Sequence, residues 1–190
     1  ERETWHLDQW ADDIAIFCST LGISSPVVFG QSFGGMVAMH YAARHPKGIS
    51  KLILSSTAAQ FRLDETVKMM RKLGGTRAAD VAREFFSNPS KVAYDTYGQV
   101  CLPLYSNPNV PAAGAFRDRA IERPEVAFHF FSDEMAQMDM RAEIANITCP
   151  TLVIGGAVDP VTPPICSEAI ADAIGDNARP QMLEDCGHGP

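Results

Sequence analysis

Residues 26–46 read "PVVFGQSFGGMVAMHYAARHP", and the pattern changes abruptly at Ser32. Residues 26–29 are apolar and rich in β-branched side chains, as in a strand that is covered on both faces. Residues 33–44 have the pattern of a helix, which Pro46 cannot continue. Ser32 is therefore expected in a sharp turn between a buried strand and a helix. Such a turn strains the serine backbone and lifts its hydroxyl above the edge of a sheet.

Two glycines, Gly30 and Gly34, flank this turn. We expect a Cβ atom at either position to collide with the adjoining strand and helix. The helix that begins near Phe33 directs free N–H groups and the positive end of its dipole toward the turn. The backbone N–H of Phe33 is therefore the expected donor to an oxyanion, and Gln31 is expected at the substrate pocket.

The rest of the chain alternates apolar strands with helices. Strands are predicted at 50–56, 149–156 and 180–185, and helices at 7–21 and from Pro163 to about Ile174, with Thr162 as N-cap of the last. This alternation predicts an α/β fold, with a mostly parallel sheet flanked by helices.

Residues 58–140 have a different character. Helical patterns there are interrupted by segments that contain Gly or Pro, and this part of the chain holds five of the eight methionines. We predict a helical insertion at 58–140 in a core formed by residues 1–57 and 141–190.

A serine hydroxyl becomes a good nucleophile only when a base takes its proton, and that base needs an orienting carboxylate. Functional groups of a parallel sheet gather beyond the carboxyl ends of its strands. Asp159 comes directly after the strand at 149–156, and His188 follows the last strand. We therefore predict that Ser32, Asp159 and His188 form a catalytic triad.

Composition excludes several classes of partner. The formal net charge is −7 without a run of basic residues, so nucleic acid and anionic membrane surfaces are not expected partners. No apolar stretch approaches the roughly 18 residues that span a bilayer. The five cysteines are odd in number and lack C-x-x-C pairs, which favours free thiols in the cytoplasm over disulfides or a metal site. The oligomeric state stays open.

Three stretches, "GQSFGGMVAMHYAARHP", "CPTLVIGGAVDPVTPP" and "EDCGHG", together resemble the α/β-hydrolase fold family over nearly all of residues 7–190. The resemblance implies acyl transfer by the triad, without a metal or organic cofactor. It also implies that residues 58–140 form the cap. Further N-terminal strands, with the second oxyanion donor, and a final helix are expected outside the chain. We therefore expect the 190 residues alone to aggregate or express poorly.

Within this family the chain is most similar to proline-iminopeptidase-like hydrolases. Such enzymes hold the substrate ammonium with glutamates of the cap, and the corresponding position here is Ala127. Phe128, Phe131 and Met135 instead predict an apolar acyl pocket, which His129 could also line. We expect cleavage of a small neutral ester, lactone or amide to exceed removal of an N-terminal proline.

Four alternatives remain open at this point. A proline iminopeptidase, a carbon–carbon bond hydrolase and a cofactor-free perhydrolase could all use the same triad. A non-catalytic ligand-binding protein on a hydrolase scaffold belongs to another class, and reaction of Ser32 with a fluorophosphonate probe would distinguish it from an enzyme.

Overall fold

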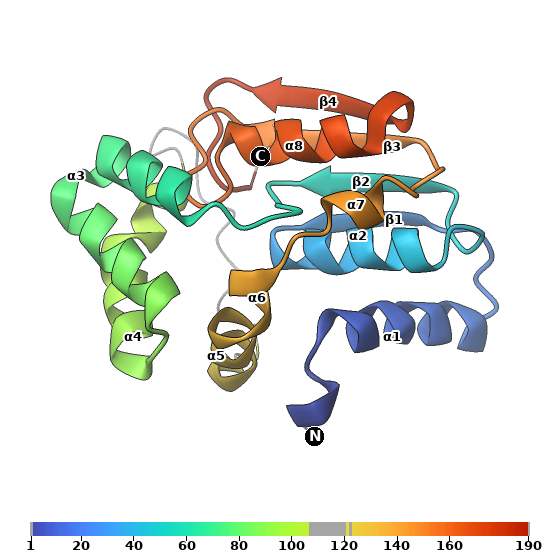
Figure 1. The fold of residues 1–190 in the computed structure, drawn as a ribbon, viewed down its shortest axis with the longest axis horizontal. Helices are drawn as coiled ribbons and strands as arrows, with labels where there is room; N and C mark the ends of the chain where they lie inside the picture. Colours follow the sequence, from blue (N-terminus) through green and yellow to red (C-terminus); the bar gives the residue numbers. More distant parts are fainter. Residues whose placement is uncertain (1, 107–120, 122, 190) are drawn as a thin grey trace.

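The computed structural model describes residues 2–106, 121 and 123–189 (Figure 1). Its sheet has the order β1-β2-β3-β4, with every neighbouring pair parallel. The strands are β1 (Val27–Gln31), β2 (Lys51–Ser55), β3 (Thr151–Gly156) and β4 (Ala178–Leu183). The predicted parallel α/β architecture is confirmed. The last strand begins two residues earlier than predicted.

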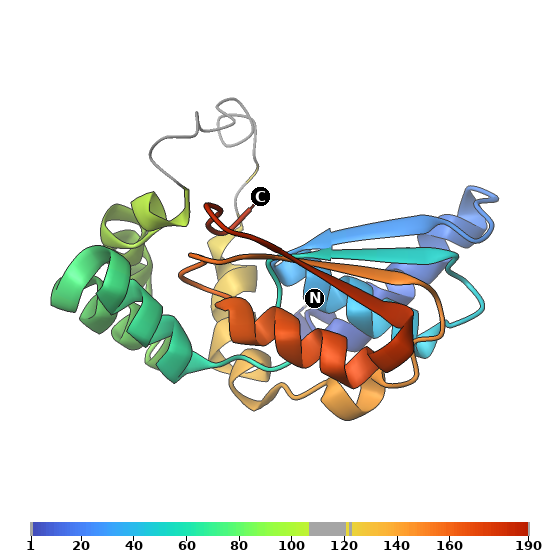
Figure 2. The ribbon, with the colours of Figure 1, turned by 90° about the horizontal axis from the view of Figure 1, so that it is seen from above.

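One face of this sheet is covered by helices in the described residues. The helices α2 (Phe33–Arg44) and α8 (Pro164–Ile174) pack on that face (Figure 2), where Leu52, Leu54 and Val153 are fully buried. On the other face, Val27 and Phe29 of β1 are 57% and 62% exposed. Coverage of the first strand on both faces, as its sequence predicts, is therefore not found in the described part of the chain.

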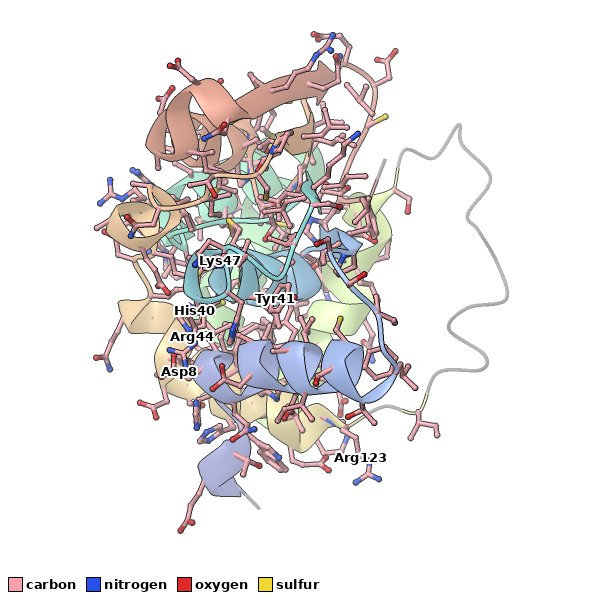
Figure 3. All side chains as sticks on the ribbon, turned by 90° about the vertical axis from the view of Figure 1, so that its right-hand side faces the viewer. Asp8, His40, Tyr41, Arg44, Lys47 and Arg123 are labelled. Atoms are coloured by element: carbon pink, nitrogen blue, oxygen red, sulfur yellow. The ribbon has the colours of Figure 1, made fainter. Side chains whose placement is uncertain are left out.

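The helix α1 (Leu7–Thr20) lies against α2; it begins where its sequence predicts and ends one residue earlier. Gly22 follows it with a φ of 66°, a left-handed conformation that favours glycine. Figure 3 shows Asp8 of α1 beside His40 and Arg44 of α2. These contacts fasten α1 to the core.

The residues between β2 and α7 (Arg141–Ile144) are called the inserted segment here. They contain α3 (Leu63–Ser87), α4 (Lys91–Val100), the 3-10 helix η2 (Leu102–Tyr105), α5 (Pro124–Ser132) and α6 (Glu134–Gln137). A kink at Gly75, with φ 74° and ψ −169°, divides α3 where the sequence shows two consecutive glycines. These helices lie beyond the carboxyl ends of the strands (Figures 1 and 2).

The two ends of this inserted segment meet. The backbone N–H of Met140 donates to the carbonyl of Ala59 at 2.8 Å, and Gln60 and Asp139 form an antiparallel bridge. The segment therefore begins and ends at one place on the core.

The helix α8 begins one residue later than predicted. Pro163 is its N-cap and Pro164 its first residue, so Thr162 is not the cap. The Thr162 hydroxyl donates to Asp159 instead.

None of the helices in the described residues is both long enough and apolar enough to cross a membrane.

Candidate active site

Ser32 occupies the strained turn between β1 and α2. Its φ of 50° and ψ of −123° lie in a region of backbone conformation that residues other than glycine rarely adopt. The backbone is held from two sides, because the Ser32 N–H donates to the Ser55 carbonyl at 3.0 Å and its own carbonyl accepts the Thr57 hydroxyl at 2.7 Å. Hydrogen bonds with a neighbouring strand and with the loop after it thus hold the backbone of Ser32 in this conformation.

The glycines around this turn differ in what they permit. A Cβ at Gly30 would lie 2.4 Å from the Gly34 carbonyl oxygen, so the close approach of strand and helix requires glycine there. Apart from its chain neighbours and the backbone of its own helix, a Cβ at Gly34 would have no atom of the described residues within 4 Å, so the collision predicted for that position is not found. Gly35 takes this role, because a Cβ there would lie 2.6 Å from the Thr57 side chain. Helical rotation turns Gly35 toward Thr57 and Gly34 toward the open side.

His188 lies between the serine and a carboxylate. Its Nε2 atom is 2.8 Å from Ser32 Oγ, and its Nδ1 atom is 2.9 Å from Asp159 Oδ2. Asp159 follows β3 and His188 follows β4, so neighbouring parallel strands bring them to the same edge. The His188 side chain is 7% exposed and that of Asp159 is fully buried.

Asp159 accepts several further hydrogen bonds. The backbone N–H groups of Val161 and Thr162 donate to Oδ1 at 2.8 and 2.9 Å, and the Thr162 hydroxyl donates to Oδ2 at 2.8 Å. A buried carboxylate is stable as an anion only when its oxygens are satisfied in this way. The sequence analysis placed Thr162 as a helix N-cap and missed its hydrogen bonds to Asp159. The signal for them was the tendency of aspartate to accept hydrogen bonds from backbone N–H groups that follow it closely.

Phe33 is the first residue of α2, where a backbone N–H has no acceptor within its own helix. Its ring packs edge-on against Trp10 and Phe130, with centroid distances of 5.0 and 4.9 Å. These two contacts hold the first turn of α2 beside the serine.

A cavity of about 450 Å³ opens next to Ser32 and His188. Nine aromatic side chains dominate its wall: Phe33, Phe61, Phe85, Phe86, Tyr94, Tyr97, Tyr105, Phe130 and Phe131. Its other lining residues are small, apolar or uncharged: Met36, Gly98, Leu102, Ala127, Met135, Val161 and Thr162. Phe131 and Met135 thus lie where an apolar pocket was expected.

Three predicted pocket residues lie elsewhere. Phe128 packs against Tyr94 from outside the cavity wall, with centroids 5.5 Å apart, and His129 packs against Trp5 at 5.9 Å. Gln31 is exposed, and its Nε2 atom lies near Gly189. For Phe128 and His129 the reason lies in α5, whose face with Ala127, Phe130 and Phe131 is turned to the cavity.

Two carboxylates close to this wall in the sequence are engaged elsewhere. Glu134 accepts the Leu7 N–H that begins α1, at 3.1 Å, and Glu125 pairs with Arg123 at 3.9 Å. In the described residues, no Asp, Glu, Lys or Arg side chain lines the cavity.

A second hollow of about 440 Å³ lies on the side of α1 and contains His6, His40 and His129. Within the part of the chain that the structure describes, no group of three or more His, Cys, Asp or Glu residues could hold a metal ion.

The family model described as alpha/beta hydrolase fold matches residues 1–190. The chain belongs to the α/β-hydrolase family. Among curated relatives of this hydrolase, strigolactone esterase D14 of Arabidopsis thaliana is 27% identical, over 97% of this chain and 67% of its own length. A pimeloyl-[acyl-carrier protein] methyl ester esterase of Aromatoleum aromaticum is 29% identical, over 86% of this chain and 67% of its own.

Solved structures agree on the fold of this α/β hydrolase. The proline iminopeptidase of Mycobacterium smegmatis superimposes with a TM-score of 0.76 at 23% identity, over 99% of this chain and 67% of that one. The present hydrolase thus spans about two thirds of the length of these three proteins.

Proposed function

We propose that this protein is a serine hydrolase that cleaves a small, neutral ester, lactone or amide through an acyl-enzyme intermediate. Ser32 is the nucleophile, His188 the general base and Asp159 the orienting carboxylate. The proposal rests on one observation above all: the imidazole of His188 lies within hydrogen-bond distance of both Ser32 Oγ and Asp159 Oδ2.

The two partners of His188 assign its tautomer. Asp159 can only accept, so Nδ1 carries the proton, and Nε2 is left to accept the proton of Ser32. Ser32 Oγ then attacks the substrate carbonyl carbon while Nε2 takes the proton, and the resulting imidazolium is stabilised by Asp159. His188 returns the proton to the leaving group.

Hydrolysis of the acyl-enzyme repeats these steps with water. His188 removes a proton from the water as its oxygen attacks the ester carbon, and Ser32 leaves with that proton. In both steps the carbonyl oxygen becomes negative, and the Phe33 N–H at the start of α2 is placed to stabilise it.

We further propose that residues 58–140 form a cap over a core of residues 1–57 and 141–190. The cavity wall supports this division, because Ser32, Met36 and His188 come from the core and most of the aromatic side chains come from the inserted segment. A cap of this kind excludes water from the acyl chain and holds it beside the nucleophile.

The lining of the cavity supports a neutral substrate. A charged ammonium or carboxylate would lose its hydration and meet no opposite charge there, which costs several kcal/mol. Two of the relatives named above are esterases, which agrees with this class of substrate. We also propose a cytoplasmic location, because all five cysteines are free thiols.

Labelling with a fluorophosphonate tests the proposal on the full-length protein. We expect the wild type to be labelled and to turn over a short p-nitrophenyl ester, whereas Ser32→Ala should lose both. Ser25→Ala is the matched control, because Ser25 is exposed and also has a positive φ, of 49°. Retention of a tenth of the wild-type activity by Ser32→Ala would refute the covalent mechanism. Absence of labelling in the wild type would favour a non-catalytic binding protein.

A further inference from the structure

The inserted segment contacts the histidine of the proposed triad through η2. The carbonyl of Tyr105, the last residue of η2, accepts the backbone N–H of His188 at 2.7 Å. The Tyr105 ring also packs edge-on against the imidazole, with centroids 5.0 Å apart and an interplanar angle of 75°. The main chain and the side chain of one residue thus both contact His188.

This approach depends on a glycine. A Cβ at Gly187 would lie 2.2 Å from the Tyr105 carbonyl oxygen, closer than a real Cβ atom can come. A side chain at position 187 would therefore separate η2 from the loop that carries His188.

Tyr97 in turn fixes Tyr105. Their hydroxyl oxygens are 2.7 Å apart, and the Tyr97 ring is packed against Phe85 and Phe86 at centroid distances of 4.6 and 5.4 Å. Tyr97 is only 5% exposed, and burial raises the pKa of its phenol well above the ordinary value of 10. The hydroxyl is therefore neutral and keeps its proton for a hydrogen bond.

We propose that Tyr105 is a positioning residue for His188 and that the Tyr97 hydroxyl holds Tyr105 in place. This inference rests on the proposed function, since it assigns a role in the same triad. The imidazole must keep Nε2 directed at Ser32 Oγ, and a displacement of about 1 Å costs on the order of 10²-fold in rate. The inserted segment thereby contributes to the alignment of the base as well as to the wall of the cavity.

The test compares five variants of the full-length protein: Tyr105→Ala, Tyr105→Phe, Tyr97→Phe, the double variant Tyr97→Phe/Tyr105→Phe, and Tyr41→Phe. Two rates are measured, turnover of a short p-nitrophenyl ester and labelling by a small alkyl fluorophosphonate. The probe is too small to depend on the far wall of the cavity, so its rate reports the alignment of Ser32 and His188. Thermal melting checks the fold of each variant.

We expect Tyr105→Ala to lower both kcat and the labelling rate by about 10- to 100-fold, with KM changed less than about threefold. Tyr105→Phe keeps the ring and should restore most of this loss. Each tyrosine-to-phenylalanine change at 97 or 105 removes the same hydroxyl contact, so the double variant should be no slower than either single one. Tyr41→Phe is the control and should label at the wild-type rate, because the Tyr41 hydroxyl donates to the Gly48 carbonyl and Tyr41 does not line the cavity.

A purely lining role of Tyr105 would raise KM for Tyr105→Ala and leave kcat and labelling unchanged, which would overturn the inference. So would additive losses in the double variant. If Tyr105→Ala does not fold, the Tyr97→Phe and Tyr105→Phe variants provide the test. Equal losses of labelling rate in the two single variants, with no further loss in the double variant, support the inference. If the wild type is labelled and Ser32→Ala is not, the proposed function stands even where this inference fails. An unlabelled wild type would overturn both.

Discussion

Thr162 donates both its backbone N–H and its hydroxyl to the carboxylate of Asp159, at 2.9 Å to Oδ1 and 2.8 Å to Oδ2. The hydroxyl also lies 3.4 Å from His188 Nδ1. Thr162, an uncharged residue, therefore fixes the plane of the carboxylate that faces the imidazole.

Replacement of Thr162 by valine should slow the enzyme without unfolding it. Thr162→Val keeps the shape of the side chain and both backbone donors but removes one hydrogen bond to the Asp159 anion. Such a bond contributes about 1 kcal/mol or somewhat more, so kcat/KM should fall about 3- to 10-fold. Thr96→Val is the control, because the exposed Thr96 hydroxyl donates to the Val92 carbonyl of its own helix. Equal rates for the two variants would contradict the role of Thr162.

Alanine should be tolerated very differently at two glycines of the serine turn. Gly30→Ala forces its Cβ against the backbone of α2 and should destabilise the protein by about 1 to 3 kcal/mol. Gly34→Ala meets open space in the first turn of α2 and should change the free energy of unfolding by less than about 1 kcal/mol. Urea denaturation of both variants measures the difference. Equal destabilisation would show that the space beside Gly34 is filled in the whole protein.

Substrate charge should separate ester cleavage from aminopeptidase activity. Ala127 lines the cavity and no carboxylate lines it in the described residues, so a free ammonium gains nothing there. Acetylation of proline naphthylamide should therefore leave kcat/KM unchanged or raise it. The comparison of the free and acetylated substrates removes the intrinsic reactivity of the leaving group. A loss of 10²-fold or more on acetylation would establish ammonium recognition and refute the neutral-substrate proposal.

Acid should remove the contribution of Asp8 to stability. The hydrogen bond from His40, with help from Arg44, lowers the pKa of Asp8 below its ordinary value of 3.8. A carboxyl with a lowered pKa in the folded state stabilises it above the unfolded pKa, and this stabilisation is lost as the pH falls through the folded pKa. Asp8→Asn should thus cost about 1 kcal/mol or less at pH 7, since the Asp8 side chain is 58% exposed, and less than that at pH 2.

The control for Asp8 is Asp13→Asn. Asp13 lies on the exposed side of α1, where its carboxylate accepts a hydrogen bond from the Gln9 side chain. We expect this variant to follow the wild type at both pH values in thermal melts. A difference between Asp8→Asn and the wild type that persists at pH 2 would assign the effect to packing rather than to charge.

Much of the fold could be predicted because each strand carries its own signal. Short β-branched runs followed by helical periodicity predicted four parallel strands and the helices between them. The carboxyl ends of parallel strands share one edge, so the residues just after β1, β3 and β4 were bound to lie near one another. Ser32, Asp159 and His188 were therefore predictable from their places along the chain.

The faces of the helices were not predictable in this way. Successive residues of a helix point about 100° apart, so an error of one residue in the buried face changes which side chains reach the cavity. From the direction of Ala127 in α5, Phe128 is turned by about 100° and His129 by about 200°, whereas Phe130 and Phe131 return to within about 60°. Only the packing of α5 against α3 and the core selects that face.

Contacts between distant segments also had no local signal. The stretch "EDCGHG" predicts a turn with a histidine, but it says nothing of Tyr105, whose carbonyl reaches His188 from 83 residues away in the sequence. In the same way, Gly35 rather than Gly34 meets Thr57 because the loop after β2 crosses one side of α2. The order of residues along the chain fixes which groups follow each strand, since that depends on local geometry. Which groups meet across the cavity depends on how whole elements pack, and this is settled by the side chains of all of them together.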